Sequence, residues 1–187
     1  MPIESYKEYF RNHLIIDELS YDKSTLINQH SDFITKLTSE QKDAYDQIMK
    51  AVDQSKEGVF FLYGYGGTGK TFLWKTLSAA LRSKGEIVLN VASSGIASLL
   101  LSGGRTAHSR FHIPLHPTDE SFYTISPSRK LGELIRRTKL FIWDEAPMRQ
   151  LVGVFESNER KEEKETEQHS DEQLKKTQTL IKVSGRF

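Results

Sequence analysis

Apolar residues in the first half of the chain recur at helical spacing before they close up into short continuous runs. Five of them fall on one face of a segment that begins near Thr38: Ala44, Tyr45, Ile48, Met49 and Val52. Thr38 with Gln41 three residues later also fits a capping box at the start of this helix. The pattern therefore predicts a helix that begins near Thr38 and ends near Val52.

Farther along, short apolar runs alternate with helical segments. The runs "EGVFFLY", "EIVLNVA" and "LFIWDE" predict strands, and "TFLWKTLSAALRSKG", "SSGIASLLLSGG" and "SRKLGELIRRTK" predict helices. Lys84-Gly85 is a suitable end for the first of these helices. Strands that alternate with helices indicate right-handed crossovers and a parallel sheet, so the fold class is α/β.

The two ends of the chain differ from this middle part. Residues 1–36 are mixed and polar, and we expect a helical N-terminal extension there, followed by the main domain over residues 37–155. Of the 21 residues 156–176, 13 are charged and only Leu174 is clearly apolar. Such a segment cannot bury enough surface to offset its chain entropy, so residues 156–187 are expected to be a disordered or lone-helical tail. Within the C-terminal part, "LVGVF" and "TLIKVSG" could each add a strand to the sheet.

Composition narrows the function only a little. The chain of 187 residues can hold one domain with a proper core, and its formal net charge of +1 points to no particular partner. The absence of cysteine excludes disulfides and thiolate metal sites. No apolar run approaches 18 residues, so we expect a soluble intracellular protein with no membrane segment.

The strongest motif is "GYGGTGKT" at residues 64–71, which matches G-x-x-x-x-G-K-[ST] between a predicted strand and a predicted helix. Its glycines let the backbone turn tightly and direct N–H groups at phosphate oxygens, and the helix start adds a positive dipole end. Lys70 would reach the β- and γ-phosphates, and the Thr71 hydroxyl would bind Mg²⁺. The expected nucleotide-binding residues of this loop are Gly64, Gly66, Gly67, Thr68, Gly69, Lys70 and Thr71.

A pair of acids, Asp144 and Glu145, follows the third apolar run. At the carboxyl end of a parallel strand these side chains would open onto the ligand crevice. Phosphoryl transfer needs a carboxylate in the magnesium shell and a residue that orients the attacking water. We assign Asp144 to Mg²⁺ and Glu145 to water activation. Together with Lys70 they form the predicted catalytic set.

Three stretches together resemble the Pif-type DNA helicases of superfamily one, and most of all the Helitron-related branch that is common in plant genomes. These stretches are "KLTSEQKDAYDQIMKAV", the long segment from "GVFFLYGYGGTGKT" to "SRFHIPL", and "LIRRTKLFIWDEAPM". "LIIDELSYDKSTLINQHSDFITKL" is similar to the segment before the motor in that branch, so the likeness covers about residues 12–148. The resemblance implies a RecA-like lobe of a P-loop NTPase that unwinds DNA in the 5′-to-3′ direction with ATP and Mg²⁺.

The resemblance also assigns roles to single residues. Gln41 matches the glutamine that contacts adenine, an alternative to its capping-box role. "GGRTAHSRF" matches a segment that contacts single-stranded DNA. The DNA-binding residues implied there are Arg105, Thr106, His108, Ser109 and Arg110. Work in DNA repair, recombination and telomere maintenance in the nucleus is implied as well.

Beyond Met148 the sequence departs from the family, and we expect a motor lobe truncated after the strand that carries Asp144. The alternative is a non-catalytic nucleotide-binding module whose charged tail contacts a protein partner. A small phosphotransferase is disfavoured, because the likeness extends well outside the phosphate loop. A truncated gene copy, a wrongly joined exon and a splice variant would each explain the departure.

Overall fold

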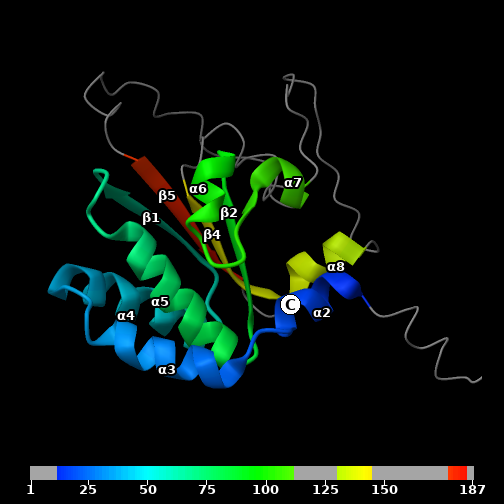
Figure 1. Cartoon of the computed structure of the whole chain (residues 1–187), viewed down its shortest axis with the longest axis horizontal. Helices are drawn as coiled ribbons and strands as arrows, with labels where there is room; N and C mark the ends of the chain where they lie inside the picture. Colours follow the sequence, from blue (N-terminus) through cyan, green and yellow to red (C-terminus); the bar gives the residue numbers. More distant parts are fainter. Residues whose placement is uncertain (1–11, 112–129, 145–176, 185–187) are drawn as a thin grey trace, which may run out of the picture.

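Five strands form a single sheet in the order β1-β5-β4-β2-β3 (Figure 1). The structure is a computed structural model that describes residues 12–111, 130–144 and 177–184. The strands are β1 (Gly58–Gly64), β2 (Ile87–Ala92), β3 (Arg105–Thr106), β4 (Thr138–Asp144) and β5 (Thr177–Val183). The three strands predicted from apolar runs are all present as β1, β2 and β4.

The directions of the strands make the sheet mixed. β2 pairs in parallel with both β3 and β4. β5 pairs antiparallel with β1 on one side and with β4 on the other, so β1 and β4 run in the same direction. The predicted parallel arrangement therefore holds for β1 to β4, and the α/β fold with helices around a sheet is confirmed.

The fifth strand comes from the stretch that the sequence assigned to the charged tail. Its residues include "TLIKV", so the alternative in which "TLIKVSG" adds a strand is confirmed. β5 pairs over its whole length with β1, from Gly58 opposite Val183 to Gly64 opposite Thr177. Thus 177–183 belong to the sheet and not to a separate tail.

Seven helices are described: α2 (His13–Leu19), α3 (Lys23–Ile34), α4 (Ser39–Asp53), α5 (Lys70–Ser83), α6 (Gly95–Leu99), α7 (Ala107–Phe111) and α8 (Lys130–Arg137). α4 begins with the predicted capping box, in which the Thr38 side chain accepts from the backbone N–H of Gln41. α5 ends where expected, with Lys84 as its C-cap and Gly85 at a φ of 80°. None of the described helices is long and apolar enough to cross a membrane.

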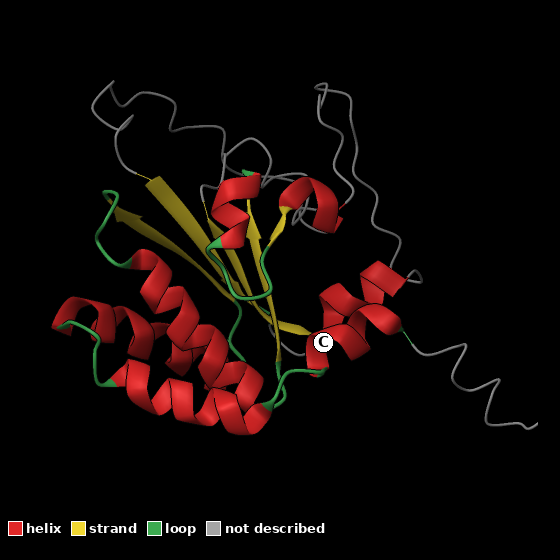
Figure 2. Ribbon diagram, viewed as in Figure 1, coloured by secondary structure: helices red, strands yellow, loops and turns green. Residues whose placement is uncertain are grey.

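Helices cover both faces of the sheet (Figure 2). One apolar cluster joins α4 and α5 to the alternate strand residues Val88, Leu140, Ile142, Ile181 and Val183. A second cluster, on the opposite face, joins α2, α7 and α8 to Leu89, Val91, Phe141, Trp143 and Leu180. Because successive strand residues point to opposite faces, β2, β4 and β5 contribute to both clusters.

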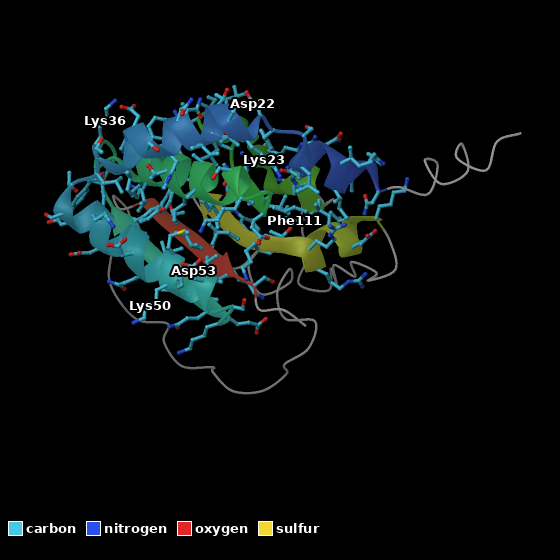
Figure 3. The ribbon with its side chains drawn as sticks, turned by 90° about the horizontal axis from the view of Figure 1, so that it is seen from below. Asp22, Lys23, Lys36, Lys50, Asp53 and Phe111 are labelled. Atoms are coloured by element: carbon cyan, nitrogen blue, oxygen red, sulfur yellow. The ribbon has the colours of Figure 1, made fainter. Side chains whose placement is uncertain are left out.

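The N-terminal extension packs against the main domain. Phe33 of α3 meets Phe72 of α5 edge-on, with ring centroids 5.2 Å apart. The His30 ring lies 2.8 Å from the Tyr45 hydroxyl on α4. Burial, with smaller contributions from nearby acids, raises the pKa of Tyr45 to about 12, so the phenol stays protonated and can donate to the imidazole. Figure 3 labels Lys36, in the turn after α3, and Lys50 of α4, and both of these side chains are exposed.

Three charged side chains meet in the interior at the junction of α2, α5 and α7. Glu18, Arg82 and Arg110 are 6%, 2% and 5% exposed. Arg110 donates to Glu18 at 2.7 Å, and Arg82 lies 3.5 Å from the other Glu18 oxygen. Arg82 also donates to the carbonyls of Ser102 and Val88. Burial lowers the pKa of Arg82, and Tyr21 and Glu18 act in the opposite direction. One carboxylate from the N-terminal extension thus pairs with two buried guanidinium groups.

We predict that Glu18→Gln destabilises the fold by about 3–5 kcal/mol, because it leaves two buried arginines without a counter-charge. Asp17→Asn is the matched control, since Asp17 is the exposed neighbour on the same helix and should change stability by less than about 0.5 kcal/mol. Chemical denaturation of both variants measures the difference. Equal stabilities would show that the three charges are not coupled in the folded protein.

Candidate nucleotide-binding site

The loop between β1 and α5 has a backbone that its glycines make possible. Gly67 and Gly69 have φ of 84° and 78°, in the left-handed region that side chains disfavour. Gly69 is also the N-cap of α5, so the N–H groups of the first turn have no side-chain cap. These N–H groups and the positive dipole end of a 14-residue helix form a site suited to phosphate oxygens.

Within this loop, Lys70 contacts backbone carbonyls. Its Nζ donates to the carbonyls of Gly64 at 2.7 Å and Tyr65 at 2.9 Å. The Thr68 hydroxyl donates to the same Tyr65 carbonyl at 2.9 Å. The ammonium is therefore held beside the mouth of the loop, and a bound triphosphate would compete with two carbonyls for its protons.

Gln41 links the start of α4 to the phosphate loop. Its Oε1 accepts from the backbone N–H of Thr38 at 3.1 Å, and its Nε2 donates to the carbonyl of Thr68 at 3.2 Å. A Cβ on Gly69 would displace this Nε2 from its place beside the loop. The capping-box prediction is confirmed, and the amide also fixes the loop. Adenine contact by Gln41 stays a prediction, and it would require the amide to give up one of these bonds.

Asp144 lies at the same sheet edge as the phosphate loop. β1 and β4 run in the same direction, so Gly64 and Asp144 both mark the carboxyl edge. Asp144 is two residues beyond Ile142, whose side chain packs in the cluster with α5. The alternation of strand side chains therefore places the Asp144 carboxylate on the face that α5 covers. Its Oδ1 accepts a hydrogen bond from the Thr179 hydroxyl at 2.6 Å.

The register of β5 sets the distance between the phosphate loop and Asp144. Thr179 is opposite Leu62 of β1, and its hydroxyl meets Asp144 of β4. Two strand spacings, or about 10 Å, therefore separate the backbone of Asp144 from that of Leu62. Gly64, the first residue of the phosphate motif, is two residues beyond Leu62. A triphosphate cradled by the loop would reach toward Asp144 across the end of β5.

The donor set at this edge fits Mg²⁺. Thr71 is the second residue of α5 and contributes a hydroxyl, and Asp144 contributes a carboxylate. Mg²⁺ usually takes one or two carboxylates and completes its octahedron with phosphate oxygens and water. In 12–111, 130–144 and 177–184 no three histidine, cysteine or acidic side chains gather as a metal cluster. Glu145, the predicted water-activating residue, lies outside the described residues.

The segment predicted to contact DNA follows β2 at the same edge of the sheet. Arg105 and Ser109 are exposed, whereas Thr106 and His108 are partly buried. Thr106 caps α7, because its hydroxyl oxygen accepts from the backbone N–H of Ser109 at 3.2 Å. Arg105 and Ser109 thus present polar groups to solvent beside the carboxyl ends of β2 and β3.

The predicted role of Arg110 does not fit its position. The guanidinium is buried and paired with Glu18, so it cannot neutralise a phosphate backbone in this conformation. The error arose because an arginine next to exposed polar residues resembles a solvated cation. Its partner is 92 residues earlier in the chain, and no local pattern connects the two.

Sequence reasoning also missed Thr179. The apolar run around it indicates a strand, but nothing in the run indicates which strands it would join. The link to Asp144 spans 35 residues, part of which is highly charged. Thr179 directly precedes the apolar residues Leu180 and Ile181, and its hydroxyl is the local feature that indicates a polar partner in the interior.

The α/β sheet, the phosphate loop after β1 and the carboxylate at the end of β4 are the features of a P-loop NTPase fold. A family model of PIF1-like helicases matches residues 36–181, which is more than half of the chain, and the chain belongs to this family. The match continues past Met148, where the likeness seen in the sequence ended, and includes 177–181 of β5. No curated protein matched the chain. At the family level, membership implies ATP binding, helicase-type ATP hydrolysis and nucleic-acid binding.

We predict that Gln41→Glu keeps one of the two hydrogen bonds of this side chain and removes the other. Glutamate still accepts from the Thr38 N–H and preserves the capping box, but it cannot donate to the Thr68 carbonyl. Loss of one hydrogen bond of about 1 kcal/mol should weaken ATP binding about fivefold, with little change in thermal stability. Isothermal titration with ATP measures the first quantity and thermal denaturation the second. Unchanged ATP affinity would show that the loop does not depend on this bond.

Proposed function

We propose that this chain is the first motor lobe of a 5′-to-3′ DNA helicase, which binds and hydrolyses ATP with Mg²⁺ and contacts single-stranded DNA. One observation carries the proposal: Asp144 and the first turn of α5 share both the carboxyl edge and one face of the sheet. Lys70 and the loop N–H groups would hold the phosphates at that place. Family membership makes ATP the expected nucleotide.

Each residue has a defined task in this proposal. Lys70 exchanges its carbonyl partners for the β- and γ-phosphates, and its charge stabilises the transition state. Thr71 and Asp144 would hold Mg²⁺ through a hydroxyl and a carboxylate oxygen, and the ion would supply positive charge against the charge that develops on the phosphates. Glu145, next in the chain, accepts a proton from the attacking water. Gln41 contacts adenine from the start of α4.

Single-stranded DNA would lie across the ends of β2 and β3. Arg105 supplies charge for the phosphate backbone, and Ser109 supplies a hydroxyl. Thr106 and His108 complete the polar surface, while Arg110 holds α7 in place from the interior. In this proposal the segment expected to contact DNA and the nucleotide share one sheet edge, so that binding at either place can affect the other. The Helitron-related branch, the nuclear role in repair, recombination and telomere maintenance, and a protein partner for the charged tail are parts of the same proposal.

Lys70→Ala is predicted to abolish ATP turnover and its stimulation by single-stranded DNA, because it removes the cation that contacts the transferred phosphate. Phosphate release by the purified chain measures this, with and without oligo-dT. Lys75→Ala is the matched control, since Lys75 is an exposed lysine on the same helix. It should retain the wild-type rate.

Three other outcomes would change the assignment. ATP binding without turnover by the wild-type chain would favour a non-catalytic nucleotide-binding module. A wild-type chain that binds neither ATP nor oligo-dT would contradict the proposal. Turnover that survives Lys70→Ala would show that the measured activity does not arise from this loop.

A further inference from the structure

One buried hydroxyl stands between the phosphate-loop strand and the strand that carries Asp144. It belongs to Thr179 of β5, which is 0% exposed. Thr179 is opposite Leu62 of β1 and donates to Oδ1 of Asp144 on β4 at 2.6 Å. Thr179 therefore contacts both strands next to β5. It pairs with β1 through the backbone, and its side chain is hydrogen-bonded to the carboxylate on β4.

The hydroxyl is polar at a position where the sheet is otherwise apolar. The next two residues of β5 on the same face, Ile181 and Val183, belong to the core cluster with α5. A buried hydroxyl without a partner is costly, so a threonine is stable here because Asp144 accepts its hydrogen bond. This buried hydroxyl therefore meets the one carboxylate of β4.

The direction of β5 brings the hydroxyl to the site. Because β5 is antiparallel to β1 and β4, its first residues lie at the carboxyl edge of those strands. Thr179 is the third residue of β5 and Asp144 is the last of β4. A parallel strand at the same position between β1 and β4 would bring its last residues, not its first, to this edge.

The bond also determines how the carboxylate is presented. Oδ1 is occupied by Thr179, and among the described residues Oδ2 has no hydrogen-bond partner. Carboxylates that bind metals are commonly oriented by such outer hydrogen bonds, and loss of one typically lowers metal affinity about 10–100-fold. We propose that Thr179 is a positioning residue for Asp144, which fixes Oδ1 so that Oδ2 is presented to the Mg²⁺ of a bound nucleotide. The inference rests on the proposed function, which makes Asp144 a magnesium ligand.

The test compares Thr179→Val, which keeps the shape but removes the hydroxyl, with Thr179→Ser, which keeps the hydroxyl. The quantity measured is the magnesium enhancement: the Kd of a fluorescent ATP analogue in EDTA divided by its Kd in excess Mg²⁺. Thr179→Val should lower this ratio about tenfold, with the Kd in EDTA within about twofold of wild type. Thr179→Ser should keep the wild-type ratio.

A double-mutant cycle separates positioning from general damage to the fold. Asp144→Asn should remove most of the enhancement, and adding Thr179→Val to it should have no further effect on the ratio, because the hydroxyl acts through the carboxylate. If valine at this position prevents folding, Thr179→Ala provides the same comparison without the added apolar methyl group. Thermal denaturation of every variant verifies that the folded protein is being measured.

The outcomes distinguish this inference from the proposed function. A wild-type chain that does not bind the analogue, or that shows no magnesium enhancement, contradicts the proposed function itself. The role of Thr179 alone would be overturned by another result. In that result Asp144→Asn removes the magnesium enhancement, but a folded Thr179→Val or Thr179→Ala variant retains it. Additive effects of the two substitutions would also overturn it.

Discussion

The two ladders of β5 are the constraint on which the arrangement of the site depends. β5 pairs with β1 along seven residue pairs and with β4 along four. β1 and β4 are not adjacent in the sheet, so their register is set through β5. That register places the end of β4 beside the phosphate loop and brings Thr179 to Asp144. A strand from the C-terminal end of the chain thereby aligns two motifs that lie 74 residues apart, from Lys70 to Asp144.

Two of the side chains expected to bind nucleotide are hydrogen-bonded to backbone carbonyls of the phosphate loop. Lys70 donates to two loop carbonyls, and Gln41 donates to a third. These bonds stabilise the loop, and those of Lys70 must be exchanged when a triphosphate enters. Nucleotide binding would therefore be coupled to the loop and to the start of α4. Glu18 gives the N-terminal extension a similar link, through Arg110, to the segment expected to contact DNA.

The sequence predicted those parts of the fold that depend on local patterns. The helix after Thr38 with its capping box, the glycine loop and the strand that ends at Asp144 follow from spacing and residue type, and all are present. β1 was only partly anticipated. Its continuous apolar run suggests a buried strand, but Val59, Phe61 and Tyr63 are 50%, 41% and 57% exposed. Burial depends on what covers each face, and a single strand's sequence does not contain that information.

The other differences between the sequence-based predictions and the structure arise from partners that are distant in the chain. The pairing of Arg110 with Glu18 and of Thr179 with Asp144 joins segments 92 and 35 residues apart. Charge and apolarity at one position do not identify a partner so distant, because strand order and helix docking determine it. The direction of β5 has the same origin: the pattern of "TLIKV" fits a parallel or an antiparallel strand equally well.

Disulfide trapping tests the position of β5 most directly, because the chain has no cysteine of its own. Val59 and Lys182 are directly opposite each other in the β1–β5 ladder. Val59→Cys combined with Lys182→Cys should form a disulfide under mild oxidation, since opposite strand residues have Cβ atoms about 5 Å apart. Tyr63→Cys combined with Lys182→Cys should not, because Tyr63 is four residues, or about 13 Å, farther along the same face of β1. Cross-linking of the first pair alone is the predicted result; failure of the first pair, or equal cross-linking of both, would contradict the placement of β5 between the phosphate-loop strand and the strand of Asp144.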